Sequence, residues 1–241
     1  SSPSVDPHQE YNDIVIGTST MSRGSWAESY MLAWSVQTFH CLGLAKFLAM
    51  FCRDEIGMPY HHFYDELRTW ANEHKNSLIG QEYTCTLNVM GDGMNGGHWG
   101  QVESRFGNVV WPTEEISFLR LISDYLKLYA ELRAFMGNLL RQCNYEITTG
   151  LINALVGYQA FMMVRPDDNK ERGIELPLNC HAYFSSIMNG EPAKLIVQHE
   201  SLIVQPKRSY ESLGEYAKLV TWYGRKGGRF TQQNVISYSK E

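Results

Sequence analysis

The sequence predicts a mainly α-helical protein, a multi-helix domain with a few short β-strands. Apolar residues recur at helical spacing through most of residues 24–164, whereas the runs rich in β-branched residues are short. The chain has 241 residues, 44% of them hydrophobic and 20% charged, so it is long enough to bury a real core. We expect residues 1–12 to be a polar linker or tail and residues 13–241 to form a single domain. A subdivision near 165–175 stays open.

The first predicted helix is rich in aromatic residues. Residues 14–16 are a short β-branched run, either a strand or an extended lead-in, and Ser22 is a suitable N-cap for a helix over 24–42. One face of this helix carries Trp26, Tyr30, Trp34, Gln37 and Cys41. A second apolar side predicts that the helix is buried nearly all round. Gly43 is expected to bend or end it before a helical continuation over 44–56.

Further helices and strands follow from similar patterns. Pro59 stands where a helix can start, and Thr113 with two following glutamates marks another helix start. Residues 77–90 are ambiguous between helix and strand, and five glycines in 91–105 favour a loop. The other predicted helices cover 60–74, 113–140, 147–164, 180–188 and a last segment from a Ser209 cap to residue 223. The predicted strands cover 106–111, 173–178 and 194–204.

The bulk composition excludes several function classes. The net charge is −5 and the pI is near 5.9, so we expect neither nucleic-acid nor membrane binding. Five scattered cysteines without C-x-x-C spacing argue against a disulfide framework and a zinc ribbon. Residues 30–51 are apolar but contain Gln37, His40 and Lys46, which favours a buried helix over a membrane span. The expected location is cytoplasmic.

The densest chemistry lies near the end of the chain, at residues 220–229. Two aromatic residues precede three cations interleaved with three glycines, and the candidate contact residues are Trp222, Tyr223, Arg225, Lys226, Gly227 and Gly228. Cationic side chains with close backbone approach at glycines suit a phosphate or carboxylate. The alternative is an ordinary helix C-terminus, with Gly224 at the C′ position and cations favoured by the helix dipole. Both interpretations stay open.

A second candidate lies in the aromatic helix. Gln37 and His40 are three residues apart on an otherwise apolar helix, alongside Trp34. A buried polar pair must be hydrogen-bonded, either to a substrate or within the core, and His40 is also a candidate proton carrier. A core histidine with satisfied hydrogen bonds is the more common arrangement.

Two further motifs are predicted to carry no function. Residues 91–96 match G-x-G-x-x-G but lack the strand–turn–helix context that dinucleotide binding requires, so a flexible loop is expected. His61 and His62 with Asp65 offer metal-ligand spacing on a helix, but there is no H-E-x-x-H motif and no third ligand stands out. No metal site is therefore expected.

Several short motifs follow one another in order along the chain. Residues 18–22 lead into the aromatic helix, and the segment Trp222–Gly228 closes the last one. The motifs between them are Gln37, His40, Gly43 and Leu44; Tyr60-x-x-Phe63-Tyr64; Phe106-Gly107-Asn108-x-x-Trp111; and Tyr216-Ala217-Lys218. Together they resemble the C-terminal region of cobalamin (B12)-dependent radical SAM proteins, over roughly residues 12–235.

The resemblance implies a part of a larger enzyme. In such proteins, N-terminal cobalamin-binding and radical SAM domains hold cobalamin, a [4Fe-4S] cluster on a C-x-x-x-C-x-x-C triad, and S-adenosylmethionine. That triad is absent here, since the cysteines are spaced by 11, 33, 58 and 37 residues. The cobalamin-ligating D-x-H-x-x-G pattern is absent as well. No cofactor is therefore predicted on this segment alone. The implied partners are N-terminal domains of the same polypeptide and a small-molecule substrate.

The resemblance thus predicts an accessory, substrate-side C-terminal domain of a methyltransferase-like radical enzyme. It would cap the active site, exclude water and contribute substrate contacts. The alternative is a stand-alone helical binding or scaffold protein whose basic, glycine-rich segment binds an anion or a partner.

Overall fold

A computed structural model describes residues 13–206, 208–224, 230–232 and 234–239. The described chain is mainly helical and has two small antiparallel sheets, which confirms the predicted fold class. The α-helices are α1 (Arg23–Ser35), α2 (Lys46–Glu55), α3 (Tyr60–Glu73), α4 (Leu78–Met94), α5 (Thr113–Ser123), α6 (Tyr125–Gln142), α7 (Leu151–Met162), α8 (Cys180–Met188) and α9 (Leu213–Tyr216). The π-helices are η1 (Val36–Cys41) and η3 (Ala217–Trp222), and η2 (Ser104–Phe106) is a 3₁₀ turn.

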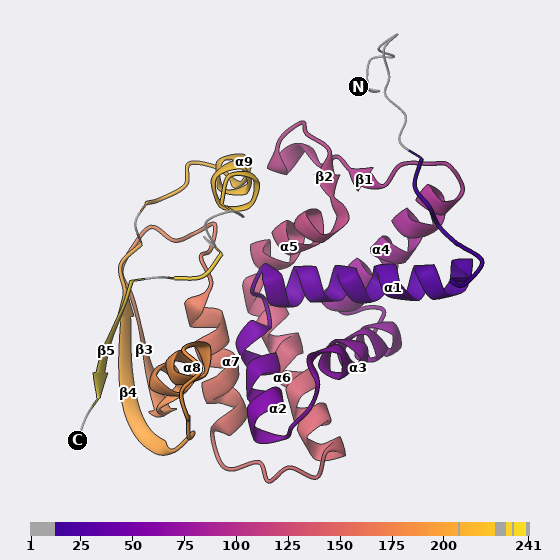
Figure 1. The fold of residues 1–241 in the computed structure, drawn as a ribbon. Coiled ribbons are helices and arrows are strands. Elements are labelled where there is room, and N and C mark those ends of the chain that lie inside the picture. Colours follow the sequence, from indigo (N-terminus) through magenta and orange to yellow (C-terminus); the bar gives the residue numbers. More distant parts are fainter. Residues whose placement is uncertain (1–12, 207, 225–229, 233, 240–241) are drawn as a thin grey trace.

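The strands form two separate sheets. β1 (Gly100–Gln101) pairs with β2 (Trp111–Pro112), while β3 (Arg172–Leu178), β4 (Val197–Val204) and β5 (Val235–Ser239) form a sheet in that order. In Figure 1 the three-stranded sheet lies at one edge, beside α7 and α8, and the helices α2, α6 and α7 run near the centre. The β1–β2 pair and α9 lie at the same end of the molecule.

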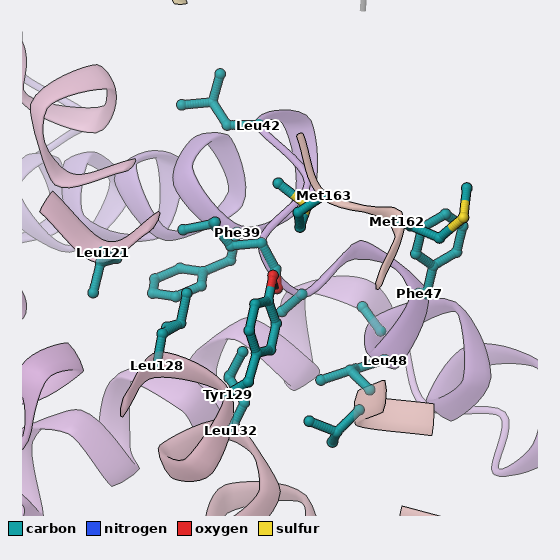
Figure 2. Close-up of a cluster of buried hydrophobic side chains, with 14 of the residues drawn as sticks. Phe39, Leu42, Phe47, Leu48, Leu121, Leu128, Tyr129, Leu132, Met162 and Met163 are labelled. Atoms are coloured by element: carbon teal, nitrogen blue, oxygen red, sulfur yellow. Dashed lines mark hydrogen bonds between the residues drawn. The ribbon is translucent and has the colours of Figure 1, made fainter. Parts of the chain in front are cut away.

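The hydrophobic core draws on nearly every helix. Figure 2 shows part of it, where Phe39 of η1, Leu121 of α5 and Leu128 of α6 gather. The same buried cluster includes Leu176 and Leu202 of the sheet, so the apolar contacts continue across the 165–175 region. Burial of this apolar surface is the main force that holds the helices together.

A sharp bend follows η1, as predicted for Gly43. The axes of Arg23–Cys41 and Lys46–Glu55 differ by 97°, and Gly43 has a φ of +93°, which favours glycine. The buried Gln159 of α7 holds both sides of the bend: its Nε2 donates to the Gly43 carbonyl at 2.8 Å, and its Oε1 accepts from the Phe47 amide at 2.8 Å. Gln159 thus satisfies two backbone groups that the bend leaves unpaired.

The bend also bears on the membrane question. Within the described residues, no single helix is long and apolar enough to cross a membrane. The two helices joined at the bend would together be sufficient in length and composition.

The π-helix η1 corrects the prediction for the aromatic helix. Its wider turns, with the Leu42 amide bonded to the Gln37 carbonyl at 2.9 Å, rotate the later side chains away from the α-helical face. Within η1, Thr38 and Phe39 are buried, whereas Gln37 and Cys41 are exposed. The expectation that this helix is buried nearly all round, with Gln37 inside, is wrong.

Several predicted boundaries also differ. The ambiguous residues 77–90 are helical, and α4 continues through Met94 into the predicted glycine loop. The predicted helix over 113–140 is broken at Asp124, whose φ and ψ of −118° and 52° are not helical. Only Trp111 of the predicted strand over 106–111 is a strand residue. The last helix is capped by Ser212 rather than Ser209, and β5 was not predicted.

Candidate functional site

The predicted site residues lie in different environments. Trp34 is buried in the core, where its Nε1 donates to the Ser117 Oγ at 3.1 Å and its ring meets Phe39 edge-on. Gln37 lies on the surface, three residues further along. The structure therefore separates two residues that the sequence pattern places on one face, since Met31, Trp34, Ser35 and Thr38 form the buried side of this helix and Gln37 lies outside it.

His40 is half-buried and bonded to a buried tyrosine. Its Nδ1 lies 2.8 Å from the Tyr64 hydroxyl oxygen, and its ring contacts Tyr60 edge-on at 5.0 Å between centroids. Burial, and to a lesser extent the Lys46 ammonium, lower the pKa of His40, while burial raises the pKa of Tyr64 well above its usual range. The Tyr64 hydroxyl therefore stays protonated and can donate a hydrogen bond to the neutral imidazole of His40.

Trp222 and Tyr223 end η3 and are exposed to solvent. The Trp222 ring meets Trp111 edge-on at 5.5 Å, and the Lys218 ammonium lies 5.9 Å from the centre of the Tyr223 ring. A Cβ at Gly224 would fall 1.9 Å from the Val220 carbonyl oxygen, so only glycine fits where the helix ends. Arg225, Lys226, Gly227 and Gly228 lie outside the described residues.

The structure reveals an aromatic pocket that the sequence did not predict. This open cavity has a volume of about 420 Å³ and is lined by Ile14, Trp26, Tyr30, Trp99, Gly100, Val110, Trp111, Pro112, Thr113 and Glu114. Three of the rings form one wall: Trp26, Tyr30 and Trp99 each lie 5.5 Å from the other two between centroids. Trp26 and Tyr30 belong to the predicted aromatic face, whereas Trp99 follows the glycine-rich stretch that was expected to be only a loop.

Hydrogen bonds fix the wall of the aromatic pocket. The Tyr30 hydroxyl donates to the Thr113 Oγ1 at 3.1 Å, and the Thr113 hydroxyl in turn donates to the Trp99 carbonyl at 3.0 Å. Gly93 lets the Trp99 ring approach, since a Cβ there would lie 2.5 Å from the indole. Burial raises the pKa of Tyr30, so its hydroxyl remains a donor at neutral pH. These contacts join α1, α4 and α5 around one ring cluster.

A partly buried charge network positions β1 beside the aromatic pocket. The guanidinium of Arg120 on α5 lies 2.6 Å from a Glu103 carboxylate oxygen, 2.8 Å from the Gln101 Oε1 and 3.5 Å from a Glu82 oxygen. Burial raises the pKa of Glu82 and outweighs the opposing effect of Arg120. Because Gln101 pairs with Trp111 across the two strands, this network also holds Trp111 in the wall of the pocket.

The aromatic pocket suits apolar or aromatic groups. Its aromatic faces offer stacking and dispersion contacts, and Glu114 supplies a carboxylate at its edge. Among the described residues, no three His, Cys, Asp or Glu side chains come together as ligands for a metal ion. All five cysteines are described and none forms a disulfide, and no three of them come together as ligands for a [4Fe-4S] cluster.

Comparison with known proteins adds a distant similarity. No known family model matches the chain. It is 22% identical over 186 residues to the cobalamin-dependent radical SAM methyltransferase TokK of Streptomyces tokunonensis. It is equally similar to the 2-(S-pantetheinyl)-carbapenam-3-carboxylate methyltransferase of Streptantibioticus cattleyicolor. Each match covers 70% of this chain and 26% of the relative, so the chain spans about a quarter of the length of these relatives.

Proposed function

We propose that this chain is the accessory, substrate-side C-terminal domain of a cobalamin-dependent radical SAM enzyme that is methyltransferase-like. The observation that carries the proposal is the distant similarity to two methyltransferases, which extends over 70% of the chain but only 26% of theirs. In such an enzyme, further domains of the same polypeptide hold cobalamin, the cluster and S-adenosylmethionine. This chain adds residues around the substrate and excludes water from the reaction.

The aromatic pocket supports this role. One relative, by its name, acts on a pantetheinyl carbapenam, a substrate with a small ring carboxylate and a long flexible arm. An apolar pocket of about 420 Å³ has room for part of a substrate of that size. The proposed contacts are Gln37, His40, Trp222, Tyr223, Arg225, Lys226, Gly227 and Gly228, of which the last four lie outside the described residues. Trp34 acts from the core, through its contact with Phe39 on η1.

The first experiment determines the reading frame upstream of residue 1. The proposal expects an in-frame C-x-x-x-C-x-x-C triad that follows a cobalamin-type domain. A start codon directly before residue 1, with no such partner, would overturn it and leave a free-standing helical binding protein as the better explanation.

A second experiment uses the complete enzyme and tests the contacts. His40→Ala and Gln37→Ala should each raise the KM for the substrate while the cobalamin and cluster absorption spectra stay unchanged. Val197→Ala is the matched control, because this residue is 81% exposed on β4, away from the proposed contacts. If both alanine variants keep the KM and turnover of the parent enzyme, these two residues do not contact substrate.

A further inference from the structure

Exposed apolar side chains surround the aromatic pocket. Ile14 and Val110 line it with exposed fractions of 48% and 63%, and Val15 beside Ile14 is 68% exposed. Trp222 extends the surface, because its ring contacts Trp111 in the wall of the pocket, and Tyr223 is the next residue along the chain and is 57% exposed. We refer to these five exposed side chains, Ile14, Val15, Val110, Trp222 and Tyr223, as the apolar rim.

The apolar rim gathers elements that are far apart in the sequence. It combines the lead-in before α1, the residues at β2 and the end of η3. Figure 1 shows the β1–β2 pair and α9 at one end of the molecule, where the described chain also begins. Exposed apolar side chains gathered next to an open pocket are typical of an interface rather than of a free surface.

Chain connectivity favours one occupant of this surface. Ile14 belongs to the apolar rim and is residue 14 of the chain, so a domain that precedes residue 1 is tethered to this surface by residues 1–13. A short tether gives such a domain a millimolar effective concentration, which no free partner or second copy matches at ordinary concentrations. The relatives are about four times as long as the matched region, so they contain ample polypeptide to cover this face.

We propose that the aromatic pocket and the apolar rim are the docking surface for the part of the polypeptide that precedes residue 1. This inference rests on the proposed function, since that preceding part is the radical SAM portion. The docked portion presents an apolar patch that covers Val110 and Trp222 and closes the pocket against water. The pocket thereby becomes an enclosed cavity between the two portions of the enzyme.

The test is carried out on the complete polypeptide, with Val110→Asp as the probe. An aspartate at the centre of a dry interface has no partner and should separate the two portions. We expect the radius of gyration in X-ray scattering to rise and hydrogen-exchange protection of residues 13–22 to be lost. Circular dichroism should stay unchanged, because Val110 is exposed in this chain. The matched control is Val197→Asp on β4, which should change neither scattering nor exchange.

The outcomes separate this inference from the proposed function. If the complete polypeptide carries the radical SAM portion but Val110→Asp leaves scattering and exchange unchanged, the docking surface is wrong and the proposed function stands. If the upstream reading frame lacks that portion, both fail. In that case, sedimentation of this chain alone, with and without Val110→Asp, shows whether a second copy covers the face instead.

Discussion

The indole ring of Trp222 meets that of Trp111 edge-on, with 5.5 Å between their centroids. This contact joins an exposed residue at the end of η3 to a buried one in the wall of the aromatic pocket. Trp222 is 42% exposed and Trp111 only 1%. The pair therefore couples the predicted C-terminal contact segment to a pocket built by α1, α5 and the β1–β2 strands.

The two tryptophans should differ in their contribution to stability. Trp222→Ala loses an edge-on contact and part of an exposed ring, so we expect the free energy of unfolding to fall by about 1 kcal/mol. Trp111→Ala empties a buried position and should cost about 3–5 kcal/mol. Urea denaturation of this chain measures both values. Equal losses would show that Trp222 is held far more tightly than its exposure indicates.

The sequence predicted the helices well where the apolar period is regular. The helix over 180–188 was predicted with the boundaries that the structure shows, and the strand over 173–178 differs from β3 by one residue. The break at Asp124 was missed because the apolar pattern continues on both sides of it. β5 was missed because its pairing with β4 is a long-range contact that local residues do not encode.

The candidate site was predicted less well, for a physical reason. A π-helix leaves no clear mark in the residue pattern, and within η1 Gln37 lies at the surface while Thr38 lies in the core. The aromatic pocket depends on Trp99 reaching α1 across a glycine-rich turn, and this contact is tertiary. The one local signal was a tryptophan within the glycine-rich stretch 91–100, where a small residue such as Gly93 allows close packing.

Two glycines with positive φ separate backbone strain from crowding. Gly57 has a φ of +70° and nothing within 4 Å of an added Cβ, so Gly57→Ala should cost about 1–2 kcal/mol through strain alone. At Gly43, φ is +93° and an added Cβ would lie 3.2 Å from the Thr231 Cγ2. Gly43→Ala should therefore cost more, about 2–4 kcal/mol. Thermal and urea unfolding compare the variants, and equal costs would mean that the bend at Gly43 relaxes freely.

Arg120 and its partners Glu82, Gln101 and Glu103 should contribute to stability as a unit. Arg120→Met leaves the Glu82 carboxylate buried without its cation and should cost about 3–5 kcal/mol. Adding Glu82→Gln to this variant removes the unpaired charge and should restore part of the loss. Arg105→Met is the control. The Arg105 side chain, which pairs with Glu103, is 49% exposed, and such exposed ion pairs contribute at most about 1 kcal/mol to the free energy of unfolding. A double variant less stable than Arg120→Met would contradict this account.

His40 should titrate below the ordinary histidine value of 6.5. Burial is the larger cause and the nearby Lys46 ammonium the smaller, so Lys46→Gln should raise the pKa of His40 without restoring it fully. Lys75→Gln, at an exposed position beyond the far end of α3, should leave it unchanged. Histidine ring resonances in a pH series of NMR spectra measure these shifts.

The lowered pKa of His40 also sets a direction for stability. Between the folded pKa and about 6.5, the unfolded chain binds a proton at this histidine that the folded chain does not. The contribution of His40 to the free energy of unfolding is therefore fully present above pH 6.5 and is lost as the pH falls through its folded pKa. His40→Gln should remove this part of the acid sensitivity, as measured by urea midpoints between about pH 5 and 8. A variant with the same pH dependence as the parent chain would show that other groups govern the acid response.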